Sequence, residues 1–133
     1  MKSAVQTKKL LEIYYDGFAR KQDWEMVLSD DFRFMRCDMN PSGPMIGKQA
    51  YIEVINRFSK VFETMRVKEM LIDGENACVI GNYDFKFPNG VYKNGDVAEL
   101  WKVKDGKLAS LTIFFDTHTF VENTPKQRAD GIQ

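Results

Sequence analysis

The chain has 133 residues, 44% of them apolar and 13% aromatic, which is enough for one domain with a single sizeable core. Nineteen basic residues balance nineteen acidic ones, and no run of Lys or Arg stands out, which argues against nucleic acid and anionic membrane surfaces as partners. We therefore expect a small and uncharged ligand.

The start of the chain and its few sulfur and imidazole groups exclude further classes of protein. No apolar stretch approaches the roughly 18 residues of a membrane span, and the start MKSAVQTKKLLEIYY has charges where a secretory signal would be apolar, which predicts a cytoplasmic protein. Cys37 and Cys78 lie in apolar runs without metal-ligand spacing, so we interpret them as buried structural thiols. With one His a His-rich metal site is excluded, although an all-carboxylate site is not, and we expect neither a metal nor another cofactor.

Three helices are predicted in the first half of the chain. A capping-box pattern at Ser3 and apolar residues at helical spacing predict a first amphipathic helix that ends near Arg20. Asp23 can cap a short second helix in WEMVLS, which precedes a strand in FRFMRC. A turn follows between Pro41 and Gly47. A longer amphipathic helix is then marked by Tyr51, Ile55, Phe58, Phe62 and Met65.

From Val67 onward the pattern changes to short alternating runs divided by turn residues, which is typical of an antiparallel meander. The runs are VKEMLID, ACVIGNYDFKF, DVAELWKV and LASLTIFFDTHTF. Asp73-Gly74 and Asp105-Gly106 predict hairpins, and segment 88–95 predicts a longer loop or two turns. A polar stretch follows, so we expect one domain over residues 1–120 and a C-terminal tail over residues 121–133.

Helices followed by a sheet predict an α+β domain in which a curved antiparallel sheet wraps around about three N-terminal helices. The last strands carry apolar residues on both faces, with Val97 and Trp101 on one face and Ala98 and Leu100 on the other. One face can pack on the helices, while the other is more apolar than a monomer leaves exposed. We therefore expect a homodimer formed through the sheet.

The segments KQDWEMVLSDDFRF, PMIGKQAYIEVINRF and ELWKVKDGKLASLTIFFD, in this order after a long amphipathic helix, resemble the nuclear transport factor 2-like superfamily. Within it they resemble the SnoaL-like and ketosteroid isomerase-like branch, over about residues 5 to 120. The resemblance implies a cone-shaped, cystatin-like α+β barrel, usually dimeric, with a pocket between the concave sheet and the helices. Members include isomerases, dehydratases, polyketide cyclases, epoxide hydrolases and non-catalytic scaffolds, so the fold does not define the reaction.

Asp38 is the first candidate for catalysis. If FRFMRCD is a strand, alternation places Phe32, Phe34 and Arg36 on the same face as Asp38, which ends the strand. Apolar neighbours raise the pKa of a carboxylate and make it a better proton acceptor. The resemblance implies a catalytic base at this place. The alternatives are an Asp that forms a turn with Asn40, or one whose pKa is lowered by Arg36.

Tyr14 and Glu99 are the candidate donors of the same site. A Tyr on the apolar side of the first helix can direct its hydroxyl into a pocket and stabilise an enolate oxygen, although helix rotation decides between Tyr14 and Tyr15. Glu99, or less favourably Asp96, puts an acid on an apolar strand parity, which is costly unless the acid is protonated or paired. By resemblance, Tyr14 matches the oxyanion-hole Tyr, and Glu99 stands where the family uses Asp. The alternatives are a core Tyr and an outward or paired Glu.

Asp116 and His118 form an alternative site. They share one parity of the predicted last strand, where the acid could orient the only His as a general base for a dehydratase-like or cyclase-like reaction. Aromatic residues could line a pocket for a flat apolar ligand, or could simply form the core. The candidates are Phe18, Trp24, Phe34, Phe58, Phe62, Tyr83, Phe85, Trp101 and Phe114.

Two functions follow from these candidates. The first is cofactor-free proton transfer on a small apolar or aromatic carbonyl compound, as in ketosteroid isomerase-like isomerisation, with Asp38 as base and Tyr14 and Glu99 as donors. The second is a non-catalytic ligand-binding or dimerisation module whose pocket holds a ligand or is filled by its own aromatic residues. A solidly filled interior would favour the second function.

Overall fold

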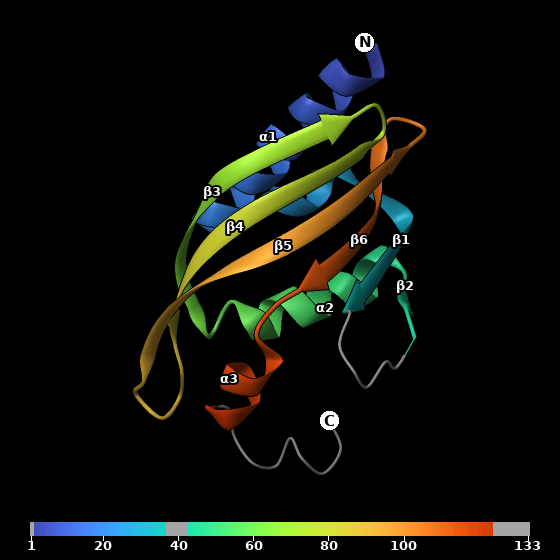
Figure 1. Ribbon diagram of the computed structural model, residues 1–133. Helices are drawn as coiled ribbons and strands as arrows, with labels where there is room; N and C mark the ends of the chain where they lie inside the picture. Colours follow the sequence, from blue (N-terminus) through green and yellow to red (C-terminus); the bar gives the residue numbers. More distant parts are fainter. Residues whose placement is uncertain (1, 37–42, 124–133) are drawn as a thin grey trace.

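The computed structural model describes residues 2–36 and 43–123 (Figure 1). Its helices are α1 (Lys2–Arg20), the 3-10 helix η1 (Trp24–Val27), α2 (Lys48–Phe58) and α3 (Thr117–Glu122). Its strands are β1 (Leu28–Arg36), β2 (Met45–Ile46), β3 (Phe62–Asp73), β4 (Asn76–Lys86), β5 (Tyr92–Lys104) and β6 (Lys107–Phe114). Within the described ranges, no helix has an apolar stretch long enough for a bilayer.

The six strands form one curved sheet in the order β2-β1-β6-β5-β4-β3, with the helices on its concave side (Figure 1). The meander from β3 to β6 is antiparallel, as predicted. β1 pairs with β6 in parallel, so the sheet is mixed rather than purely antiparallel. Such a parallel pair needs a long crossover, and here α2 and four further strands lie between the two partners in sequence. The α+β class, with a sheet curved around the helices, is confirmed.

Three elements differ from the predictions. Asp23 has a left-handed backbone (φ 59°) and its side chain caps nothing, so the second helix is only a 3-10 turn. α2 ends at Phe58, and Phe62 and Met65 belong to β3, because a tight turn over residues 59–61 separates the two elements. β6 ends at Phe114, and the residues that follow form α3 instead of continuing the strand.

The core lies between the concave face of the sheet and α1, η1 and α2. Alternate residues of β4 and β5 point inward, as the strict alternation of buried positions along β4 shows. The inward side chains are mostly aromatic, and their rings meet those of the helices in stacked and edge-on contacts. The largest fully buried side chains are Trp101, Tyr14, Tyr51, Phe32, Phe62 and Phe87.

Candidate functional site

A carboxylate lies in the middle of this aromatic core. Glu99 points inward from β5 and is only 6% exposed. Its Oε1 accepts a hydrogen bond from the Tyr15 hydroxyl of α1, and its Oε2 accepts one from the Tyr83 hydroxyl of β4 at 2.7 Å. Trp101 Nε1 donates to the Tyr15 hydroxyl at 2.8 Å. We call these four residues the Glu99 cluster.

The sheet makes room for this cluster at a glycine. Gly81 of β4 lies at an inward position beside Glu99 and Tyr83. A Cβ at this position would lie 2.9 Å from the Tyr83 ring and 3.4 Å from Glu99 Oε1. The missing side chain therefore leaves the space that the Tyr83 ring and the carboxylate occupy.

Burial dominates the electrostatics of the cluster. It raises the pKa of Glu99 from 4.5 to about 7, although the hydrogen bonds from Tyr15 and Tyr83 lower it. Burial also raises the pKa of both tyrosines, and the nearby Glu99 charge raises it further. A carboxyl group that titrates near neutral pH can both donate and accept a proton, so this cluster could act as an acid or a base.

Tyr14 belongs to a second buried pair of hydroxyls. The hydroxyl oxygens of Tyr14 and Tyr51 lie 2.7 Å apart, and burial raises the pKa of both residues. The Tyr14 ring packs edge-on against Tyr15 and Trp101, with ring centroids 5.0 and 4.7 Å apart. Tyr14 therefore borders the Glu99 cluster, while the hydrogen bond to Glu99 comes from Tyr15.

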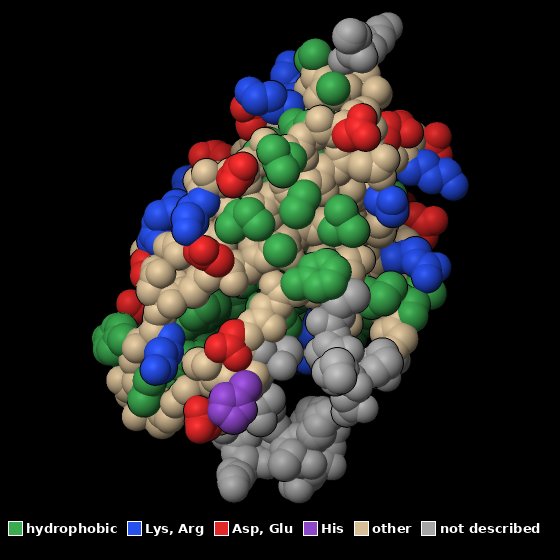
Figure 2. Space-filling model, viewed as in Figure 1, with side chains coloured by type: hydrophobic (Ala, Val, Ile, Leu, Met, Phe, Trp, Pro, Cys, Tyr) green, Lys and Arg blue, Asp and Glu red, His purple; other side chains and the backbone are tan. Residues whose placement is uncertain are grey.

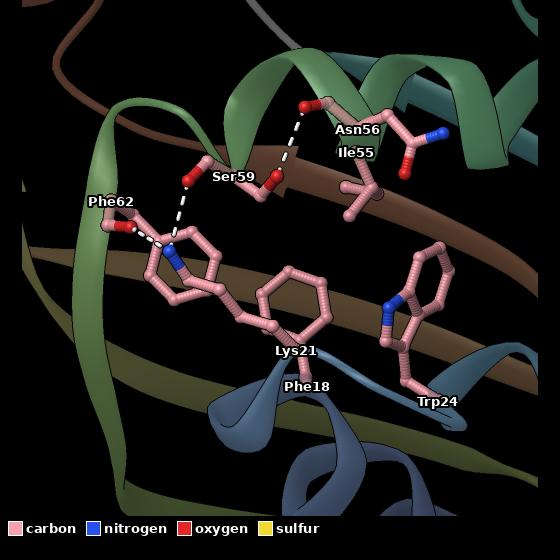
Figure 3. A pocket seen from close by; sticks show the side chains of 7 residues that line it. All are labelled: Phe18, Lys21, Trp24, Ile55, Asn56, Ser59 and Phe62. Carbon is pink, nitrogen blue, oxygen red and sulfur yellow. Dashed lines mark hydrogen bonds between the residues drawn. The ribbon is translucent and has the colours of Figure 1, made fainter.

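A cleft of about 40 Å³ lies between the end of α1, η1 and the end of α2 (Figure 3). Lys21 Nζ donates to the carbonyl oxygens of Ser59 at 2.9 Å and Phe62 at 2.6 Å, and it lies 4.4 Å from the centroid of the Phe62 ring. The ammonium thus ties the end of α2 to the start of β3. Because one water needs about 10–15 Å³, this cleft has room for only about three waters. It is lined by Phe18, Lys21, Trp24, Ile55, Asn56, Ser59 and Phe62.

A larger cleft of about 120 Å³ lies between the end of the β4–β5 hairpin and α3, and we call it the mouth cleft. It adjoins the Glu99 cluster in two ways. Val97 lines the cleft and precedes Glu99 by two residues on the same face of β5. Phe85 also lines it and stacks on Tyr83, with centroids 5.9 Å apart. The apolar walls are Phe85, Phe87, Val97, Phe115 and Phe120, and the polar lining includes Lys93, Asn94, Asp116 and Thr119.

Residues 11–111 match the SnoaL-like domain family. The chain belongs to this family. Solved structures share the fold of this SnoaL-like domain, and one is TerC co-crystallised with polyporic acid, with 20% identity, a TM-score of 0.75 and coverage of 89% of this chain and 97% of that chain. An NTF2-like protein of unknown function from Burkholderia pseudomallei K96243 has 21% identity, a TM-score of 0.74 and coverage of 89% and 96%. A candidate SnoaL-like polyketide cyclase from Jannaschia sp. CCS1 has 16% identity, a TM-score of 0.78 and coverage of 90% and 92%. No curated protein matches the sequence.

The SnoaL-like domain brings some of the predicted site residues together. Glu99 is the inward acid, because Asp96 lies on the outer face of β5, where it pairs with Lys68 at 2.9 Å. Phe34, expected on the face of Asp38, points into the core, whereas Asp38 itself lies outside the described residues. The sequence marked Tyr51 as part of a helix but not as a site residue. Its place on the apolar side of α2 was the signal that could have identified it.

Asp116 and His118 do not share a face of a strand, so that expectation is wrong. They lie at the start of α3, where the Asp116 carboxylate accepts hydrogen bonds from the Thr119 N–H at 3.1 Å and the Thr119 hydroxyl at 2.7 Å. These bonds cap the helix and lower the pKa of Asp116. The His118 side chain is 83% exposed and lies 3.7 Å from Glu122. Asp116 therefore caps α3, and His118 contacts solvent.

Eight of the nine predicted pocket aromatics lie in or against the core, where they fill the interior around Glu99. Phe114 is the exception, at 45% exposure, because it pairs with the outward position Ala98. Cys78 is half-buried on the outer face of β4 rather than fully buried, and Cys37 lies outside the described residues. Within residues 2–36 and 43–123, no three His, Cys, Asp or Glu side chains are grouped as a metal site would require.

Proposed function

We propose that this SnoaL-like protein binds a small, flat, apolar carbonyl compound and transfers a proton on it without a cofactor. The observation that carries the proposal is the buried carboxyl of Glu99, whose pKa of about 7 suits proton exchange at neutral pH. Its tyrosine partners hold this carboxyl in a site without bulk water, where the carboxyl proton could stabilise a developing oxyanion. The co-crystallisation of TerC with polyporic acid supports a small organic ligand for this fold.

In this proposal Asp38 is the base. It removes a proton from the carbon next to the carbonyl group, the electron pair moves to the oxygen, and the proton returns to another carbon. The donor at the oxygen is Glu99, and Tyr15 positions it, since the Tyr15 hydroxyl donates its single proton to Glu99 Oε1. Glu99 then acts as the neutral acid, which its raised pKa favours.

A non-catalytic binding module is the second candidate. Both oxygens of Glu99 already have partners within the protein, and aromatic rings fill the surrounding space. A buried polar network that is fully satisfied can serve folding alone, because it makes one arrangement of the core much more favourable than others.

Asp38→Asn is expected to abolish proton transfer, and Glu99→Gln to slow it by about 10²-fold or more, as is usual for loss of a general acid or base. The measurement is deuterium exchange into 2-tetralone in D₂O, followed by proton NMR. Asp31→Asn is the matched control, because Asp31 is an exposed carboxylate on β1. Exchange by the wild type at the buffer rate would contradict proton transfer and favour the binding module.

We also propose that two copies pair through the outer face of the sheet. Figure 2 views this face and shows apolar side chains gathered over the strands. Strand pairing joins outward residues into two rows across the sheet, and Leu71, Leu100 and Phe114 are 60%, 37% and 45% exposed. A face of this kind is more often covered by a partner than left in water. The rows are Leu71, Cys78 and Leu100, and beside them Ile80, Ala98 and Phe114.

Leu100→Glu is expected to convert the dimer to a monomer, because it places a charge in the middle of the apolar face. The measurement is molar mass by size-exclusion chromatography with light scattering. Val5→Glu is the control, since Val5 is an apolar residue of α1 that is 69% exposed. A wild-type monomer at high protein concentration, or a dimer that survives Leu100→Glu, would contradict this interface.

A further inference from the structure

We infer that the mouth cleft is the ligand site and that Phe120 of α3 occupies the position of an aromatic ring of the ligand. The inference rests on the proposed small-molecule function and adds where the ligand binds and which segment must move. The ligand that it implies is a flat aromatic compound of about two rings.

The first support is how Phe120 is held. Its ring lies 5.3 Å from Phe87, 5.6 Å from Phe115, 5.9 Å from Phe85 and 6.2 Å from Phe58, measured between centroids. Three of these contacts are edge-on and one is stacked, which are the favourable arrangements for aromatic pairs. The residues come from α2, from β4 and its end, and from the segment after β6. The cleft is thus already shaped to hold an aromatic ring.

The second support is the size of the cleft. An apolar cavity of about 150 Å³ is known to accommodate benzene, and the mouth cleft has about 120 Å³ beside the Phe120 ring. The space is therefore slightly too small for one further ring. If Phe120 moves away, the combined volume accepts a ligand of about two rings.

The third support is that α3 can move without disturbing the sheet. It has six residues, which is too short for a helix to be stable on its own. Among the described side chains, its contacts with the rest of the domain include the Phe120 ring and a hydrogen bond of 3.0 Å from Asn89 Nδ2 to Asn123 Oδ1, while Asp116 caps its start. None of these groups belongs to the pairing between strands, so all can be released while the six-stranded sheet stays intact.

The position of the cleft also fits the proposed chemistry. A ring in place of Phe120 lies against Phe85, which stacks on Tyr83 of the Glu99 cluster. A second ring extending along Val97 approaches Glu99, because the two residues are neighbours on the inward face of β5. Lys93 belongs to the polar lining of the same cleft, so a polar substituent on the ligand could contact its ammonium group.

The test is fluorescence titration with the apolar aromatic probe N-phenyl-1-naphthylamine. Phe120→Ala is expected to lower its Kd by about tenfold or more relative to wild type, because the protein no longer competes for the site. Met26→Ala truncates a side chain of η1 that is 60% exposed and lines neither cleft, and it is expected to leave the Kd unchanged. Asp116→Ala removes the cap of α3 and is expected to raise the association rate in stopped-flow experiments.

An unchanged or higher Kd in Phe120→Ala would overturn the inference, since Phe120 would then be a wall of the site or the probe would bind elsewhere. Circular dichroism checks that the variant is folded, and if it is not, Phe120→Leu is expected to shift the Kd less in the same direction. Adding Val97→Trp to Phe120→Ala fills the cleft and should remove the gain; a persistent gain also overturns the inference. Deuterium exchange into 2-tetralone separates the proposed proton transfer from the proposed ligand site. If probe binding depends on Phe120 but no exchange occurs, only the proposed catalysis is refuted.

Discussion

Raising the pH from about 5 to about 8 should lower the free energy of unfolding of the wild type by up to about 3 kcal/mol relative to Glu99→Gln. The cause is that Glu99 has a pKa of about 7 in the folded protein and an ordinary value of 4.5. Between these values the folded state keeps a proton that the unfolded state has released. The stabilisation is therefore complete below about pH 4.5 and is lost as the pH rises through about 7.

Glu99→Gln is the appropriate reference because it removes the titration and keeps the contacts. The amide oxygen can accept the Tyr15 hydrogen bond, and the amide nitrogen can donate to the Tyr83 hydroxyl. Urea unfolding of both proteins at several pH values gives the difference between their free energies of unfolding. The titration of all other groups cancels in this difference. A difference that does not change with pH would show that Glu99 is hydrated in the folded protein, and would remove the main support for its role as an acid.

The sequence indicated Glu99 as a candidate inward acid, because it interrupts the apolar face of Val97 and Trp101 in the alternation of β5, while an outward or paired Glu was the alternative. It could not choose between Tyr14 and Tyr15. Adjacent helix residues are about 100° apart, and the apolar side of α1 is wide enough to bury both. Only the positions of β5 and α2 decide that Tyr15 meets Glu99 and Tyr14 meets Tyr51.

Two errors in the predicted elements have local causes. Phe58, Phe62 and Met65 have helical spacing, yet a turn after Phe58 places the other two on β3. Both point inward there because the pairing register shifts between Phe62 and Thr64. The run after Phe114 is rich in Thr and Phe and therefore suggests a strand, but Asp116 lies three residues before Thr119 and caps a helix.

The interior itself could not be predicted, because the same aromatic residues can line a cavity or fill one. Which of these occurs depends on distances between elements that are far apart in the sequence, such as α1 and β5. The parallel pairing of β1 with β6 is also nonlocal, and it closes one side of the sheet around the rings. The rings pack against each other around Glu99, and the larger open space is left at the mouth, between the β4–β5 hairpin and α3.

Trp101→Ala is expected to lower the free energy of unfolding by about 4 kcal/mol, a large part of the 5–15 kcal/mol that is typical of a domain. Trp101 is completely buried, and its ring centroid lies 4.7 Å from that of Tyr14. Its removal leaves a cavity between α1 and β5 and takes away the donor to the Tyr15 hydroxyl. Urea unfolding at pH 6 measures the change.

Trp101→Phe separates the two contributions, because it keeps much of the ring volume and loses the N–H group. We expect it to cost about 2 kcal/mol, partly from the lost volume and partly from the lost hydrogen bond. In a double-mutant cycle with Tyr15→Phe, a coupling of about 1 kcal/mol is expected if the Trp101 N–H orients the Tyr15 hydroxyl toward Glu99. A coupling near zero would mean that packing alone holds Tyr15 in position, so that the hydrogen-bond chain from Trp101 to Glu99 contributes nothing to the stability of the site.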